Sequence, residues 1–157
     1  MPLISIVTPV FNPPLSALRS CINSVLSQSF HDWEWCVVDD CSTDPKVLKL
    51  LRKAAQKNKR IRLVERKVNG GIVAASQDGL DISTGEFIAL LDHDDELHIH
   101  ALKEVALRIN NEPEVDYLYS DEDKVDADGN HFEVFRKPDF DPIRLLGQNY
   151  CCHLSVF

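Results

Sequence analysis

Short apolar runs and longer amphipathic segments alternate along most of the chain. Runs rich in Ile, Val and aromatic residues predict strands at 3–10, 33–38, 61–65, 87–91 and 115–119. Between them, apolar positions recur at helical spacing over 15–28, 45–57, 72–81 and 101–109. This alternation predicts an α/β fold, a doubly wound and mainly parallel sheet with helices on both faces.

Turn residues mark the boundaries of these elements. Pro13 and Pro14 end the first strand, and Pro113 ends the fourth helix. Asp44 followed by Pro45 is typical of an N-cap and the first helical residue. The run 87–91 is unbroken and short, so we expect a strand that is buried on both faces.

The regular alternation stops after residue 119. A tight turn at Asp128-Gly129 predicts a C-terminal hairpin whose returning arm covers about 132–136. We expect a short helix at 143–146 and a last strand over 150–157.

Composition indicates one globular domain without a nucleic-acid partner. The 157 residues are 44% hydrophobic and 27% charged, which is ordinary for a soluble domain. The formal net charge of -8 argues against nonspecific binding to the phosphate backbone of a nucleic acid. Five cysteines without a Cys-x-x-Cys pair, and no secretory leader, favour a reducing cytoplasm. Cys151 and Cys152 would face opposite sides of a strand, so we expect neither a vicinal disulfide nor a zinc site.

Acidic residues follow the predicted strands. Asp92, Asp94 and Asp95 come directly after the run 87–91, at the carboxyl edge where open α/β sheets bind ligands. Such carboxylates repel one another unless a cation lies between them, and Mg²⁺ or Mn²⁺ prefers oxygen ligands. The alternative is an acidic turn that caps the next helix. His93 points away from its neighbours if the strand continues, which favours packing over metal ligation.

Two further groups of acids have open roles. Asp39 and Asp40 end the second strand, and a phosphoacceptor domain would carry such a pair after its first strand. The segment 121–123 (Asp-Glu-Asp) would line the sugar or acceptor side of the cleft, and a solvated hairpin explains it almost equally well.

Two nucleotide-binding motifs are missing from the sequence. The first strand-to-helix turn, 8–14, lacks the Gly-x-Gly-x-x-Gly of a dinucleotide-binding domain, and no Gly-Lys-Ser or Gly-Lys-Thr of a P-loop occurs. That turn also has no basic residue, which argues against a nucleotidyltransferase that holds a triphosphate there.

Four stretches form a further pattern: Ser-Ile-Val-Thr-Pro-Val-Phe-Asn at 5–12, Val-Val-Asp-Asp-Cys-Ser-Thr-Asp at 37–44, Asn-Gly-Gly-Ile at 69–72 and Leu-Asp-His-Asp-Asp at 91–95. Together they resemble glycosyltransferase family 2. The segments 119–124 and 148–150 are similar to bacterial members that build cell-surface polysaccharide. The resemblance implies a GT-A (Rossmann-like) fold and an inverting transfer from a UDP- or dTDP-sugar to a glycan or lipid-linked acceptor.

The resemblance also implies roles for individual residues. Pro9, Val10 and Phe11 would line the nucleoside pocket, Asp40 would accept a hydrogen bond from the base, and Asp39 would support it. Gly70 and Gly71 would lie close to the nucleoside and ribose, although turns demand glycine in any case. Asp92 would contact the ribose and the coordination shell of the metal ion. Asp94 would bind Mg²⁺ or Mn²⁺ on the diphosphate, with Asp95 as a further metal ligand.

The catalytic base of this family lies in a later acidic motif, so we expect it beyond Phe157. On this basis the chain is a single, truncated donor-binding domain: 1–112 is the nucleotide-binding half, and 113–157 begins the acceptor-side part. We expect it in the cytoplasm or, for the full-length protein, at the inner face of the membrane, with no transmembrane segment in this chain. The competing functions are a nucleotide-sugar-binding module without turnover and a nucleotidyltransferase.

Overall fold

The computed structural model describes residues 1–126 and 128–157. Over these residues the strands are β1 (Ile4–Val10), β2 (Trp33–Asp39), β3 (Ile61–Glu65), β4 (Phe87–Leu90), β5 (Leu118–Tyr119), β6 (Glu122–Val125), β7 (His131–Phe135) and β8 (Ser155–Val156). The helices are α1 (Leu15–Leu26), α2 (Pro45–Lys57), α3 (Gly71–Ile82), α4 (Ala101–Asn111) and α5 (Pro142–Gly147).

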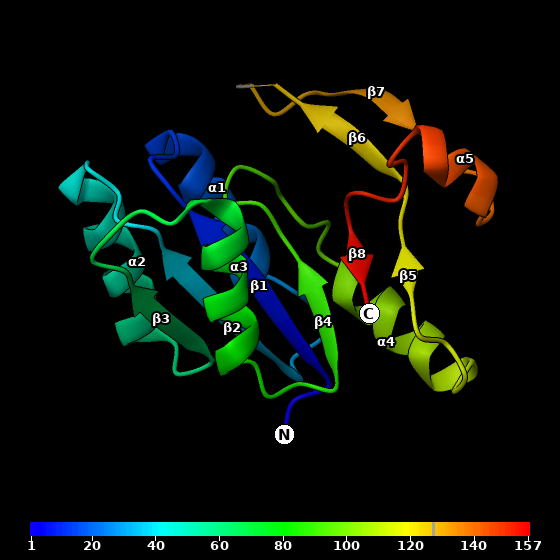
Figure 1. The fold of residues 1–157 in the computed structure, drawn as a ribbon, viewed down its shortest axis with the longest axis horizontal. Helices are drawn as coiled ribbons and strands as arrows, with labels where there is room; N and C mark the ends of the chain where they lie inside the picture. Colours follow the sequence, from blue (N-terminus) through cyan, green and yellow to red (C-terminus); the bar gives the residue numbers. More distant parts are fainter. Residues whose placement is uncertain (127) are drawn as a thin grey trace.

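A mainly parallel sheet forms the centre of the molecule (Figure 1). Its strand order within the described residues is β3-β2-β1-β4-β8-β5, and only β8 runs antiparallel to its neighbours. Val10 pairs with Asp39, and Asp39 pairs with Glu65, so these parallel strands end together at one edge. This confirms the predicted α/β fold class.

Helices cover both faces of the sheet. The buried faces of α1 and α2, with Leu102 of α4, pack in one apolar core against Ile4, Ile6 and the two tryptophans of β2. α3 packs on the opposite face, where it crosses in front of the sheet in Figure 1. It approaches so closely that a Cβ on Gly79 would lie 2.7 Å from Cγ1 of Val7.

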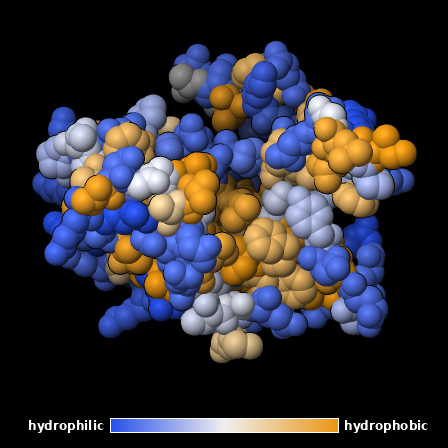
Figure 2. Space-filling view, viewed as in Figure 1, coloured by the Kyte–Doolittle hydropathy of each residue, from blue (hydrophilic) through white to orange (hydrophobic). Residues whose placement is uncertain are grey.

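The expectation that the run 87–91 is buried on both faces is wrong. Leu90 is 36% exposed and Ile88 is only half-buried. The reason is that α3 packs over β1 and β2, which leaves this face of β4 open. Figure 2 shows hydrophobic surface in the middle of that face.

Two C-terminal strands are shorter than their sequence patterns predict. β5 is confined to Leu118–Tyr119 because its ladder partner β8 offers only Ser155 and Val156. Residues 150–153 leave the ladder because the Lys137 ammonium donates to the carbonyls of Cys151 and His153. Backbone groups that are satisfied by a side chain no longer require a strand partner.

The predicted hairpin is confirmed as the antiparallel pair β6 and β7. Asp126 Oδ1 accepts hydrogen bonds from the N–H groups of Asp128 and Asn130, and Gly129 has a φ of +84°. Residue 127 lies outside the described residues. None of the helices in the described part of the chain has the length and apolarity that crossing a membrane requires.

Candidate functional site

The acidic loop that follows β4 is tied down at several points. The N–H of Leu91 bonds to the carbonyl of Val7, which continues the ladder for one residue. The N–H of Asp95 bonds to the carbonyl of Asp92, and the N–H of Leu97 bonds to the hydroxyl of Ser24 on α1. These bonds turn the loop over the end of α1 and fix where its carboxylates point.

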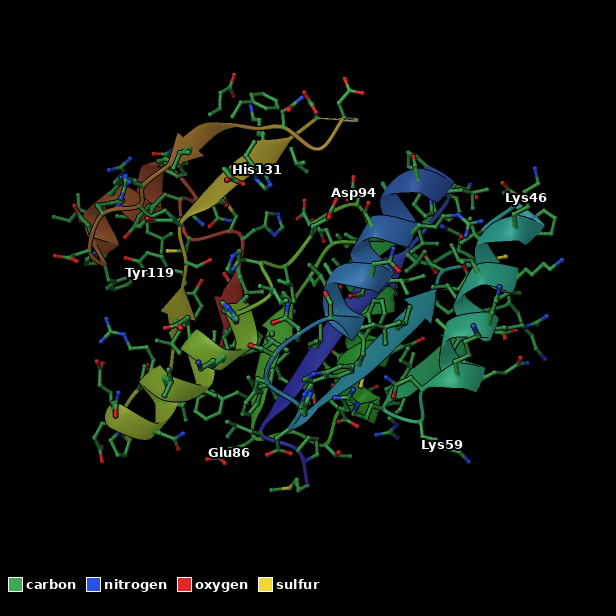
Figure 3. All side chains as sticks on the ribbon, turned by 180° about the vertical axis from the view of Figure 1, so that it is seen from behind. Lys46, Lys59, Glu86, Asp94, Tyr119 and His131 are labelled. Atoms are coloured by element: carbon green, nitrogen blue, oxygen red, sulfur yellow. The ribbon has the colours of Figure 1, made fainter. Side chains whose placement is uncertain are left out.

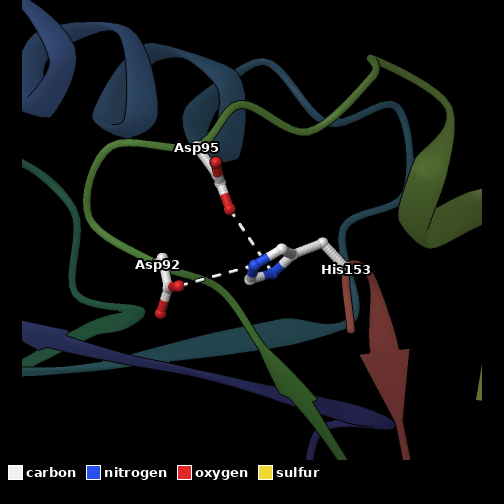
Figure 4. A group of neighbouring side chains, drawn as sticks. All are labelled: Asp92, Asp95 and His153. Atoms are coloured by element: carbon white, nitrogen blue, oxygen red, sulfur yellow. Dashed lines mark ion pairs between the residues drawn. The ribbon is translucent and has the colours of Figure 1, made fainter. Parts of the chain in front are cut away.

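The structure brings Asp92 and Asp95 together with His153 (Figure 4). His153 Nε2 lies 3.5 Å from Asp92 Oδ2, and its Nδ1 lies 3.4 Å from Asp95 Oδ2. One ligand atom from each of the three side chains lies within 4.8 Å of the others. Burial raises the pKa of Asp95, and the carboxylates of Asp92 and Asp94 raise it further, whereas His153 lowers it.

This donor set fits a divalent cation. Two carboxylates and an imidazole are ligands that such ions accept, and all three side chains are half-buried rather than freely solvated. Of the three predicted metal ligands, Asp92 and Asp95 belong to this group, while Asp94 is exposed. His93 instead donates from Nδ1 to the carbonyl of Pro9 at 3.0 Å, because a carbonyl can only accept.

The metal motif alone did not indicate His153. Its placement follows from β8, which runs antiparallel to β4 with Leu90 opposite Ser155. His153 lies two residues before β8, so the pairing of β8 with β4 brings the segment that carries it alongside the loop after β4. If the sequence had indicated that β4 has an antiparallel partner, it would therefore also have indicated His153.

Asp40 joins the ends of β1, β2 and the glycine loop. Its side chain is 3% exposed, and its Oδ1 accepts from the N–H of Gly70 at 2.9 Å and from Arg66 Nε at 3.0 Å. Its Oδ2 accepts from the N–H of Gly71 at 2.8 Å. Arg66 also pairs with Asp78 at 2.9 Å. The sequence-predicted Asp40, Gly70 and Gly71 therefore lie together, and the carboxylate shapes the loop.

Asp39 belongs to the other face of β2. Side chains alternate along a strand, so Asp39 shares a face with Trp35 and Val37. Its Oδ2 accepts from the N–H of Ser42 at 3.3 Å, whereas its Oδ1 is buried without a hydrogen-bond partner among the described residues. Through the bond to Ser42, Asp39 stabilises the turn at 40–43.

The residues predicted to line the nucleoside pocket differ in exposure. Val10 is fully buried in the core, Pro9 is half-buried, and Phe11 is 44% exposed. Asn12, with a φ of 48°, accepts from the N–H of Thr43 at 2.8 Å and so ties the end of β1 to the loop after β2.

A cleft of about 1070 Å³ separates the acidic loop from the hairpin. Asp94, Asp95 and His153 line one side, and residues 121–125 and His131 line the other. Figure 3 labels Asp94 and His131 on these two sides.

The acids of 121–123 have partners within the protein. Asp121 accepts from the N–H of Lys137, and Glu122 pairs with the Lys137 ammonium at 2.9 Å. Asp123 lies 3.1 Å from His131 Nδ1. Glu122 therefore has a structural partner even though it lines the cleft.

Comparison with known proteins identifies relatives over nearly the whole chain. A family model described as "Glycosyl transferase family 2" matches residues 5–153. An uncharacterized protein, y4gI, of Sinorhizobium fredii is 45% identical over 99% of this chain. The O-antigen biosynthesis protein RfbC of Myxococcus xanthus is 43% identical, also over 99% of this chain. The chain spans only 17% and 12% of the lengths of these two relatives.

Solved structures show the same fold. The crystal structure of S. aureus TarS 1–349 in complex with UDP aligns with a TM-score of 0.70 and 28% identity, over 81% of this chain and 37% of that one. The same TarS chain in complex with UDP-GlcNAc gives a TM-score of 0.69. The mannosyltransferase PcManGT from Pyrobaculum calidifontis aligns with a TM-score of 0.63 at 22% identity, a likeness that concerns the fold alone.

Proposed function

The chain belongs to glycosyltransferase family 2, and from this premise we propose that it binds a UDP- or dTDP-sugar and takes part in an inverting transfer of that sugar. The acceptor we propose is a glycan or lipid-linked acceptor of cell-surface polysaccharide synthesis. The likeness to the O-antigen protein and to the TarS complexes with UDP and UDP-GlcNAc supports this assignment.

The observation that carries the proposal is the pairing of Asp92 and Asp95 at the carboxyl edge of β4, beside the cleft. A diphosphate that faced these carboxylates directly would be repelled by them. A divalent cation, Mg²⁺ or Mn²⁺, would neutralise the diphosphate and act as a Lewis acid as it leaves. Asp92, Asp94 and Asp95 would hold that cation.

The nucleoside would lie along the other half of the same edge. Phe11 offers an exposed ring at the end of β1, and the Gly70–Gly71 loop offers backbone without side chains. Asp40 holds this loop with its own hydrogen bonds. Its remaining acceptor capacity would meet the N–H of a uracil base.

We propose that the chain has the two functional parts that the sequence predicts. Residues 1–112 carry the nucleotide-binding half, and 113–157 form the beginning of the acceptor side, across the cleft. The proposal assigns no catalytic base within the chain. It places the protein in the cytoplasm or at the inner face of the membrane.

A donor panel tests the proposal. The chain is mixed with Mn²⁺ and radiolabelled UDP-, dTDP-, GDP- and ADP-sugars, and bound label is counted after rapid filtration. We expect retention of uridine or thymidine diphosphate sugars and little of the others. Retention of none, or of adenosine and guanosine sugars equally, would contradict it. Release of pyrophosphate from UTP and a sugar 1-phosphate would instead indicate a nucleotidyltransferase.

A further inference from the structure

We propose that His93 is a positioning residue, which holds the acidic loop after β4 against the end of β1 and so sets the separation between the cation and the nucleoside. The inference rests on the proposed function, because it concerns how the two halves of that same site are joined. His93 acts through the backbone carbonyl of Pro9, with which its side chain makes a hydrogen bond. It need contact neither the cation nor the nucleotide.

The hydrogen-bond ladder between β1 and β4 ends where the acidic loop begins. In a parallel ladder every second residue of a strand bonds to the same neighbour. On the β4 side of β1, the carbonyl of Val7 accepts from the N–H of Leu91 at 3.0 Å. Pro9 is the next residue of β1 on that side, and a proline has no N–H to donate. The chain after β4 therefore lacks a ladder donor at this point and can leave the sheet.

The side chain of His93 takes the place of a backbone donor in this ladder. One more step of the ladder would bring the N–H of residue 93 to the carbonyl of Pro9. Among the described residues, that carbonyl instead accepts from Nδ1 of the His93 imidazole at 3.0 Å. The imidazole is half-buried. The loop thus departs from the sheet but stays attached to a fixed point on β1.

Pro9 lies between the two halves of the proposed site. β1 is placed between β2 and β4 in the sheet (Figure 1). On the β2 side, the carbonyl of Val10 accepts from the N–H of Asp40 at 2.8 Å, and Asp40 holds the glycine loop. On the β4 side, His93 is the middle residue of the segment 92–94, between two carboxylates that would hold the cation. Two consecutive carbonyls of β1 therefore fix the nucleoside half and the cation half.

Other contacts of the loop reach different parts of the fold. Sγ of Cys21, on α1, donates to the carbonyl of Asp92 at 3.6 Å. The hydroxyl of Ser24, also on α1, accepts from the N–H of Leu97. Figure 4 shows the contacts of the loop with the C-terminal segment. A ligand that reaches two sites binds tightly only when their separation matches its own, so the bond to the strand that carries the nucleoside half should matter most for UDP.

Two variants of His93 test this role. His93→Leu removes the donor, whereas His93→Asn places an amide N–H close to the position of Nδ1. The affinity for UMP in chelator reports on the nucleoside half, the affinity for Mn²⁺ alone reports on the cation half, and UDP with Mn²⁺ uses both. We expect His93→Leu to lose about fivefold or more of the gain in UDP affinity that Mn²⁺ gives. The affinities for UMP and for Mn²⁺ alone should each change by no more than about twofold.

The rescue and the control complete this experiment. His93→Asn should restore most of the Mn²⁺-dependent gain. His31→Leu should leave all three affinities as in the parent, because His31 is exposed and precedes β2, at the opposite edge of the sheet. The full gain in His93→Leu, an equal loss of UMP, Mn²⁺ and UDP affinity, or no rescue by His93→Asn would each overturn the inference.

Nuclear magnetic resonance of the parent without Mn²⁺ tests the bond itself. The correlations between ring protons and ring nitrogens differ between an imidazole with its hydrogen on Nδ1 and one with its hydrogen on Nε2. At about pH 8, where an ordinary imidazole is neutral, we expect the Nδ1–H form for His93, identified by the correlations that His93→Asn lacks. The Nε2–H form would overturn the inference.

The donor panel separates this outcome from the proposed function. If the parent retains UDP-sugars and His93→Leu keeps the full Mn²⁺-dependent gain, the inference about His93 fails and the proposed function stands. If the parent retains no nucleotide diphosphate sugar, both fail, because there is then no ligand whose two halves His93 could align.

Discussion

Replacing Asp40 with Asn should destabilise the protein strongly, although the two side chains have nearly the same shape. In the parent, one carboxylate oxygen accepts from Gly70 and Arg66 and the other accepts from Gly71. An amide offers one oxygen and one NH₂ group, so in either orientation a donor would face a donor.

The magnitude follows from burial. The Asp40 side chain is 3% exposed, so the NH₂ group of the replacing Asn would be buried, and a buried donor without an acceptor costs about 1–3 kcal/mol. Loss of the charged bond to Arg66 adds about 1–2 kcal/mol, limited because Arg66 keeps its partner Asp78. We therefore expect Asp40→Asn to lower the free energy of unfolding by about 2–5 kcal/mol.

Urea denaturation followed by the fluorescence of Trp33 and Trp35, both buried, would measure this change. Asp44→Asn is the matched control, because Asp44 caps α2 through Lys46 N–H and Asn caps a helix as well as Asp does. The control should change stability by no more than about 0.5 kcal/mol. A loss below about 1 kcal/mol in Asp40→Asn would refute the reasoning.

Two other substitutions test contacts that β1 makes with its neighbours in the fold. Burial raises the pKa of Glu34, but hydrogen bonds from Ser5 and Thr84 and the charge of Arg62 outweigh it and hold the pKa below its usual value. A lowered pKa stabilises the fold above about pH 4.3 and loses that effect as the pH falls through the folded-state value. Denaturation at pH 7 and pH 3 measures the free energy of unfolding of the parent and of Glu34→Gln. The parent should be the more stable at pH 7, and this difference should be smaller at pH 3. A difference that is the same at both pH values would contradict the reasoning. Gly79→Ala should cost about 1 kcal/mol despite its better helix propensity, because the new methyl would lie 2.7 Å from Cγ1 of Val7. Adding Val7→Ala should reduce that cost in a double-mutant cycle, and strictly additive effects would argue against the overlap.

The elements of the nucleotide-binding half could be predicted because their signals are local. β-branched runs, Asp44 before Pro45, and Pro113 after the fourth helix each mark structure within a few residues. The predicted strands 61–65 and 33–38 agree nearly to the residue with β3 and β2. The acidic loops could be placed at the carboxyl edge because parallel strands end together.

The C-terminal part was less predictable because its structure depends on contacts between distant residues. β5 and β8 are held by each other and by β4 rather than by a strong pattern of their own. The Lys137 ammonium donates to the carbonyls of Cys151 and His153, so these carbonyls do not pair in the strand that the sequence predicts over 150–157. For the same reason His153 could not be recognised beside Asp92, which lies far from it in the sequence.

The measurement that bears most directly on the central claim is isothermal titration calorimetry of UDP into the chain, with Mn²⁺ and with a chelator, and with ADP in place of UDP. The claim is that a cation between Asp92 and Asp95 lets the carboxyl edge of β4 accept a uridine diphosphate. It predicts that Mn²⁺ tightens UDP binding by about tenfold or more and that ADP binds weakly under both conditions. Equal affinity for UDP in chelator and in Mn²⁺ would contradict it.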